Sequence, residues 1–146
     1  MNEIKANWKG NMSFEANVDG HKIILDADAE VGGQNQGPKP KPLLLVALAG
    51  CTGMDVVSLL KKMRVKIDDL QISVAGEPSE EHPIYYKKVK LTYLVKGQDL
   101  DKEKIEKAVR LSQERYCGVS YTLQQVAEMD YEIIYSNEEV PTQATH

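Results

Sequence analysis

The sequence predicts an α+β fold in which β-strands surround one long apolar helix. Segments with alternating apolar and polar residues occupy residues 4–26 and recur at 70–95, a pattern typical of strands. Between them, residues 43–63 are apolar on nearly every face, which is typical of a helix covered on most sides. With 146 residues, of which 42% are hydrophobic, the chain is long enough to build one core.

The first third of the chain predicts a meander of strands followed by an irregular loop. Apolar residues alternate over residues 4–8, 12–18 and 21–26, and Asp19-Gly20 supplies a turn between the last two segments. Residues 32–42 then combine turn-forming residues with three prolines, which cannot donate backbone hydrogen bonds. We therefore expect a loop here, with a helix beginning at its end.

The helix expected from Leu43 to about Met63 has nearly the length of a membrane span. It carries Asp55, and a carboxylate near the centre of a span costs about 2.5–3.5 kcal/mol. Lys61 and Lys62 in the last turn suit the negative end of the helix dipole. The pattern favours a buried core helix, so we expect no membrane association.

Two further strands are expected at residues 70–76 and 84–95, the second with one exposed face. Asp101 can then cap a helix that ends at Gly118, with Cys117 at its exit and with one apolar stripe that includes Ser112. A short helix near 122–127 and a strand at 131–135 complete the pattern. We expect one domain over residues 1–136 and a polar tail over 137–146.

Composition and motifs narrow the possible functions. The net charge of −4 and the pI near 5.4 give no electrostatic reason to expect a nucleic acid partner. The N-terminus lacks the order of a secretory signal, so we expect a cytoplasmic protein. The three histidines lie far apart and no phosphate-binding loop is present, so we expect neither a metal nor a cofactor.

The two cysteines, Cys51 and Cys117, are the candidate reactive residues. Small neighbours, Gly50, Thr52 and Gly53, leave room beside the Cys51 sulfur, although tight helix packing explains the glycines equally well. A reactive thiol needs a cation or a hydrogen-bond donor to stabilise the thiolate. Six basic residues are candidates for the stabilising cation, and their spacing in the sequence does not choose among them: Lys5, Lys9, Lys22, Lys39, Lys41 and Arg115.

Asp55 lies one helical turn after Cys51 and on the same face. It could orient a catalytic group, but a buried carboxylate that meets a lysine across the core is the favoured interpretation. His21 and His82 are expected to be solvated, and the tyrosines of residues 85–93 to fill a core or an interface.

Two segments resemble those of a known family. Residues 42–57, PLLLVALAGCTGMDVV, resemble the central helix of the OsmC/Ohr family, and residues 116–123, YCGVSYTL, resemble its second cysteine motif. Trp8-Lys-Gly, His82-Pro83 and the turn at Gly97 follow in the family's order, so the resemblance covers nearly the whole chain. It implies antiparallel sheets around a long buried central helix, in a dimer whose two subunits intertwine.

The resemblance also implies a reaction. Cys51 would be the peroxidatic cysteine that attacks an organic hydroperoxide, Cys117 would resolve the sulfenic acid to a disulfide, and an external dithiol would restore both thiols. The family's activating arginine and glutamate are absent from their usual places, because residues 1–41 contain no arginine and the helix is preceded by Lys39-Pro40-Lys41. Two alternatives therefore stay open: a non-enzymatic ligand-binding or redox-sensing protein, and a scaffold dimer with packed cysteines.

Overall fold

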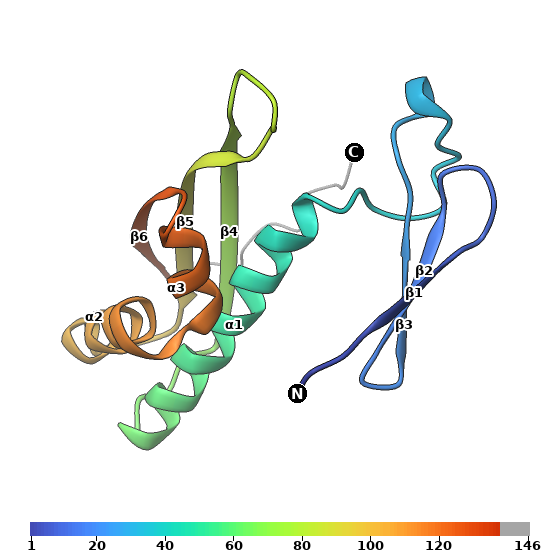
Figure 1. The fold of residues 1–146 in the computed structure, drawn as a ribbon. Coiled ribbons are helices and arrows are strands. Elements are labelled where there is room, and N and C mark those ends of the chain that lie inside the picture. Colours follow the sequence, from blue (N-terminus) through green and yellow to red (C-terminus); the bar gives the residue numbers. More distant parts are fainter. Residues whose placement is uncertain (138–146) are drawn as a thin grey trace. The chain divides into compact units, whose positions relative to one another are not determined.

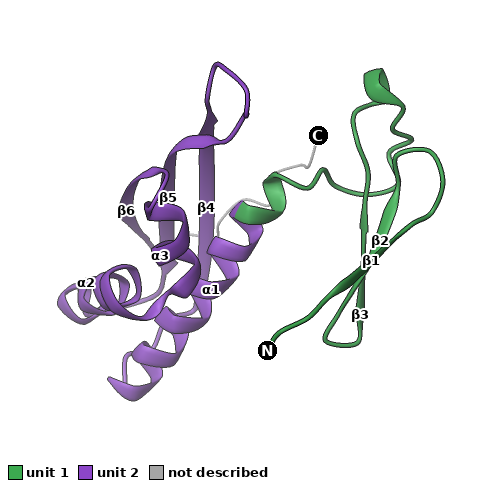
Figure 2. Cartoon of the chain, in the orientation of Figure 1, with its two compact units in different colours: residues 1–44 green, residues 45–146 purple. Residues whose placement is uncertain are grey.

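The computed structural model describes residues 1–137, which divide into two compact units (Figure 2). The first unit comprises Met1–Leu44, and the second begins at Leu45. The single domain expected over residues 1–136 stays a prediction. The expected polar tail falls almost wholly on residues 138–146, which lie outside the described part of the chain.

The first unit contains the expected meander of strands. Strands β1 (Lys5–Trp8), β2 (Phe14–Val18) and β3 (His21–Leu25) form one antiparallel sheet in sequence order (Figure 1). Asp19 and Gly20 connect β2 to β3 with φ angles of 50° and 79°. Positive φ at both positions of a two-residue loop matches the right-handed twist of the paired strands, so this turn sets the register of the hairpin.

Residues after β3 form the irregular loop that the prolines predicted, with one short helix, η1 (Ala29–Val31). Asp26 organises this loop, because its carboxylate accepts backbone hydrogen bonds from Ala27, Gln34 and Gln36 at 2.8, 3.1 and 3.1 Å. These three hydrogen bonds lower the pKa of Asp26, and its side chain is buried. A structural role for Asp26 was not among our predictions.

The second unit is built on a three-stranded sheet of β4 (Asp69–Pro78), β5 (Tyr86–Lys96) and β6 (Glu128–Ser136) (Figure 1). Strand β5 lies in the middle, and its alternate residues from Val89 to Val95 are fully buried, as the sequence pattern predicted. Strands β4 and β5 are antiparallel, but β5 and β6 are parallel, which differs from the expected antiparallel sheets. The helices between β5 and β6 form the crossover that a parallel pair requires.

Three helices pack against this sheet: α1 (Pro42–Lys62), α2 (Lys102–Leu111) and α3 (Gly118–Gln124). They share one core with the buried face of β5, to which Leu48, Val56, Ile105 and Val109 belong. Asp101 caps α2 as predicted, accepting a hydrogen bond from the backbone of Lys104 at 3.2 Å. Gly118 begins α3 rather than ending the preceding helix, so the expected helix at 122–127 starts several residues earlier than predicted.

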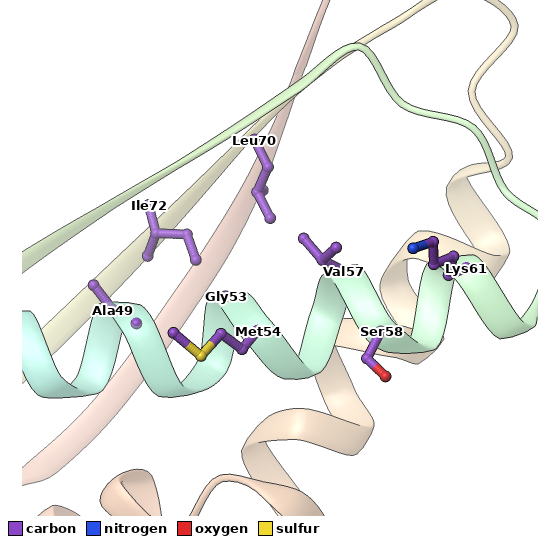
Figure 3. A pocket seen from close by; sticks show the side chains of 9 residues that line it. Ala49, Gly53, Met54, Val57, Ser58, Lys61, Leu70 and Ile72 are labelled. Carbon is purple, nitrogen blue, oxygen red and sulfur yellow. The ribbon is translucent and has the colours of Figure 1, made fainter. Parts of the chain in front are cut away.

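Helix α1 is buried on one side only within a single chain. Among the described helices it is the one long and apolar enough to cross a membrane, and 22% of its most apolar window is buried. Its outer face exposes Val46, Met54 and Val57 by 62%, 75% and 50%. An apolar groove of about 730 Å³ runs along this face and reaches Leu70 and Ile72 of β4 (Figure 3).

Candidate functional site

The second unit brings Cys51 and Cys117 together. The two Sγ atoms and a carboxylate oxygen of Asp55 all lie within 4.8 Å of one another. Cys51 and Asp55 come from successive turns of α1, and Cys117 comes from the residue that precedes α3. Cys51 is half-buried, Cys117 is only 3% exposed, and both are free thiols.

A π-helical turn of the backbone places Cys117 beside Cys51 and Asp55. Residues Ser112–Tyr116 form one turn of π-helix after α2, closed by a 2.8 Å hydrogen bond from the backbone N–H of Cys117 to the carbonyl of Ser112. Such a turn carries one residue more than an α-helical turn, and π turns are frequent at functional sites. Cys117 itself is the N-cap of α3, because its sulfur accepts the backbone N–H of Ser120 at 3.3 Å.

A network of buried, hydrogen-bonded side chains is connected to the cluster of Cys51, Asp55 and Cys117. Thr52 hydrogen-bonds both the Tyr93 hydroxyl at 2.6 Å and the Ser112 hydroxyl at 2.8 Å. Gln113 donates to Tyr93 and to Thr52 at 2.6 and 3.2 Å, and accepts from Ser120 at 2.7 Å. Thr52, Tyr93, Ser112 and Ser120 are each no more than 1% exposed. Among the described residues, no buried side-chain polar atom lacks a partner.

The direction of these hydrogen bonds follows from one contact. Ser112 donates its single hydroxyl hydrogen to Asp55 Oδ2 at 3.0 Å, so its oxygen must accept the hydrogen of Thr52. Thr52 in turn must accept from Tyr93. The hydroxyl chain therefore points toward the Asp55 carboxylate, and each hydrogen bond in it strengthens the next.

The environment of Cys117 favours its neutral form. Burial raises the pKa of Cys117 to about 11, with smaller upward effects from the neighbouring Cys51 thiol and the Asp55 charge. The N–H of Ser120 acts in the opposite direction, because a hydrogen bond donated to sulfur stabilises the thiolate. Cys117 therefore keeps its proton at neutral pH.

The prediction that Asp55 pairs with a lysine is wrong. Within residues 1–137, Asp55 forms no ion pair, and its partner is the Ser112 hydroxyl. In the described part of the chain, three of the six candidate cations interact with other residues. Lys22 pairs with Glu15 at 3.9 Å, Lys39 pairs with Asp28 at 3.2 Å, and the Arg115 guanidinium lies 5.6 Å from the ring centroid of Tyr116. The structure thus gives Asp55 a hydroxyl partner where the sequence predicted a cation.

Most of the hydroxyl network was not predicted from the sequence. One signal was available: Ser112 falls on the apolar stripe of the helix expected after Asp101, and a buried hydroxyl needs a hydrogen-bond partner. Tyr93 fills the core, which is one of the two roles expected for the tyrosines of residues 85–93, whereas Tyr85 is 43% exposed. His21 and His82 are exposed, as expected. Gln113 gave no signal, because the π turn that directs it inward could not be read from the sequence.

Comparison with known proteins identifies the family. The family model described as OsmC-like protein matches residues 33–132. The chain belongs to the OsmC-like family. It is also 30% identical over 135 residues to Protein YhfA of Escherichia coli, an alignment that covers 90% of this chain and 98% of that protein.

Solved structures with the same fold confirm the OsmC-like α+β architecture. A hypothetical protein from Aquifex aeolicus superimposes with a TM-score of 0.79 at 27% identity, covering 94% of this chain and 98% of the other. The organic hydroperoxide resistance protein OhrB of Bacillus subtilis gives a TM-score of 0.63 at 20% identity, with coverages of 91% and 97%. The second similarity concerns the fold alone.

Proposed function

We propose that this protein is a cysteine-based peroxidase that reduces organic hydroperoxides with Cys51 and Cys117. The observation that carries the proposal is the approach of the two sulfurs to within 4.8 Å, in the segments that resemble the family's two cysteine motifs. In our proposal, side-chain rotation brings these two sulfurs to the roughly 2.05 Å of a disulfide bond.

The two cysteines differ in the way that a two-step reaction needs. Cys51 is the more exposed and attacks the outer oxygen of the hydroperoxide, which yields Cys51 sulfenic acid and an alcohol. The Cys117 thiol then displaces water from the sulfenic acid and forms the Cys51–Cys117 disulfide. An external dithiol reduces this disulfide, is itself oxidised to a disulfide, and returns both cysteines to thiols.

Asp55 is suited to carry the proton in the first step. Its carboxylate lies within 4.8 Å of both sulfurs and is held by the Ser112 hydroxyl. In this proposal it accepts the proton of the Cys51 thiol, once side-chain rotation brings the two groups within hydrogen-bond reach, and returns it to the alkoxide that leaves when the O–O bond breaks. In the proposed mechanism, Asp55 therefore performs part of the function that the family's activating arginine and glutamate would perform.

The substrate class follows from the family and from the surroundings of Cys51. The neighbouring residues of α1 are apolar, which suits a hydroperoxide with an organic group. The similarly folded OhrB is named for organic hydroperoxide resistance. A cycle that depends on a dithiol reductant operates in a reducing compartment, so we place the protein in the cytoplasm.

The exposed face of α1 supports a homodimer. The groove along this face is lined by Gly50, Met54, Val57 and other largely apolar residues (Figure 3), and exposed apolar surface of this kind is typical of protein–protein interfaces. A second copy of the chain covers this face in our proposal. A Met54→Glu variant should then elute as a monomer in light-scattering chromatography, whereas an Arg substitution at exposed Glu103 should stay dimeric.

The proposal is tested by intact mass and free-thiol count before and after one equivalent of cumene hydroperoxide. The reduced protein should lose both thiols and two mass units, and Cys117→Ser should accumulate a sulfenic acid on Cys51. Cys51→Ser should consume no peroxide above background. Unchanged thiols in the native protein would instead favour the non-enzymatic ligand-binding alternative.

A further inference from the structure

The same cluster has a donor set that fits a metal ion. We propose that Cys51, Asp55 and Cys117 form a binding site for a thiophilic divalent cation of the Zn²⁺ type. The three donor atoms lie within 4.8 Å of one another and converge from two separate elements, α1 and the start of α3. This inference concerns the reduced protein and does not depend on the peroxidase reaction.

The distances are compatible with such a site. Zinc binds sulfur at about 2.3 Å and carboxylate oxygen at about 2.0–2.2 Å, so tetrahedral donors lie about 3.5–3.8 Å apart. The three donors need to approach one another by only about 1 Å, which small side-chain rotations supply. Cys51 and Asp55 are one helical turn apart, a spacing that metal sites on helices use to present two ligands on one face.

The donor chemistry selects the class of ion. A bound divalent cation displaces the thiol protons of Cys51 and Cys117 into solvent, which leaves two thiolates and one carboxylate around it. The cation offsets their three negative charges, and sulfur ligands favour zinc over magnesium or calcium. Three protein donors leave the fourth tetrahedral position open for water or a small ligand. Cys51 is half-buried and supplies the accessible side of the cluster.

Neighbouring groups already hold two of the donors in place. Ser112 donates to Asp55 Oδ2 at 3.0 Å, and the backbone N–H of Ser120 donates to the Cys117 sulfur at 3.3 Å. Hydrogen bonds of this kind orient metal ligands, and their loss typically lowers metal affinity about 10–100-fold. The hydroxyl network thus serves as the supporting layer of a metal site.

The test is a titration of the full, reduced chain with Cd²⁺ in the absence of peroxide and oxygen. We expect one Cd²⁺ per chain, a sulfur-to-metal charge-transfer band in the ultraviolet, and Zn²⁺ competing for the same site. Cys51→Ser and Cys117→Ser should each lower the affinity by more than about tenfold, and so should Asp55→Asn, which keeps both thiols. Asp99→Asn, an exposed control, should bind as the native chain does.

Two results would overturn the proposal. A native chain without a charge-transfer band has no such site, and an Asp55→Asn variant with native affinity rules out the three-donor site. A second measurement covers variants that fail to fold: one equivalent of Zn²⁺ should slow alkylation of Cys51 in the native chain at least about tenfold. An unchanged alkylation rate contradicts the site, whatever the outcome of the peroxide assay.

Discussion

The hydroxyl of Ser112 donates a 3.0 Å hydrogen bond to Asp55 Oδ2 and so joins the π turn after α2 to the middle of α1. Asp55 is thereby held beside the two sulfurs by a group that is itself fully buried. Because Ser112 also accepts the Thr52 hydrogen, its hydroxyl is the link between the core network and the reactive cluster.

Replacing Ser112 with alanine should affect both stability and reactivity. The change leaves the buried Thr52 hydroxyl without its acceptor and Asp55 without its donor, which should cost about 1–3 kcal/mol in the free energy of unfolding. Because Asp55 is no longer oriented, the pH profile of Cys51 oxidation by cumene hydroperoxide should also change. Urea unfolding and stopped-flow oxidation measure the two effects. Ser73→Ala, at an exposed position of β4, should leave both unchanged.

Replacing Tyr93 with phenylalanine tests the deeper part of the network. The ring still fills the core, but Thr52 and Gln113 lose a partner to which they are hydrogen-bonded at 2.6 Å. We expect a loss of about 1–3 kcal/mol in the free energy of unfolding. Tyr85→Phe is the matched control, since Tyr85 is 43% exposed and should change the value by less than about 0.5 kcal/mol. Equal effects of the two variants would show that the buried hydroxyl adds no stability.

The two cysteines should differ in their rates of alkylation. Cys117 is 3% exposed and its pKa is raised to about 11 by burial, so it presents little thiolate at neutral pH. Iodoacetamide at pH 7 should modify the half-buried Cys51 first, and the rate at Cys117 should rise about tenfold per pH unit up to its pKa. Peptide mass spectrometry gives both rates. Faster modification of Cys117 at pH 7 would reverse the assignment of attacking and resolving cysteines.

The raised pKa of Cys117 also has a consequence for stability. The folded state retains the thiol proton to higher pH than the unfolded state, whose cysteine titrates near about 8.5. The contribution to stability is therefore complete below that value and is lost as the pH rises toward about 11. Urea unfolding between pH 8 and 11 should show a steeper decline for the native protein than for a Cys117→Ala variant.

The sequence predicted the elements well where a local signal determines them. The Asp19-Gly20 turn, the Asp101 cap and the alternating burial of β5 were all confirmed, because turn preference, capping and periodicity act over a few residues. The parallel pairing of β6 was missed, since the direction of a strand depends on where the preceding crossover returns the chain.

The functional site was also only partly predictable from the sequence. The cysteine motifs pointed to Cys51 and Cys117, but only the fold brings their sulfurs within 4.8 Å. The partner of Asp55 was wrongly expected to be a lysine, because charge pairing is the usual solution for a buried carboxylate. The π turn presents the Ser112 hydroxyl instead, and periodicity that assumes an α-helix cannot predict such a turn.

Asp26 provides a prediction for the first unit that is independent of the cysteines. Three backbone N–H groups, those of Ala27, Gln36 and Gln34, lower the pKa of its carboxyl group by hydrogen bonding to the charged form. The folded state therefore binds the proton less readily than the unfolded state, whose aspartate titrates near about 3.9. The stabilisation of the loop is complete above that value and is lost as the pH falls through the lowered pKa.

Hydrogen exchange of the Gln34 and Gln36 amides measures this effect directly. Their protection should be constant above about pH 5 once the intrinsic exchange rate is divided out, and should fall at lower pH as Asp26 becomes protonated. Asp26→Asn should show the low protection at every pH, because a neutral amide is a weaker acceptor than a carboxylate. Asp19→Asn, at an exposed turn position with a φ of 50° that asparagine tolerates, should behave as the native chain. If Asp26→Asn keeps native protection at pH 7, the loop is held by its backbone contacts alone, such as the 3.0 Å hydrogen bond from the Asp26 N–H to the carbonyl of Pro38.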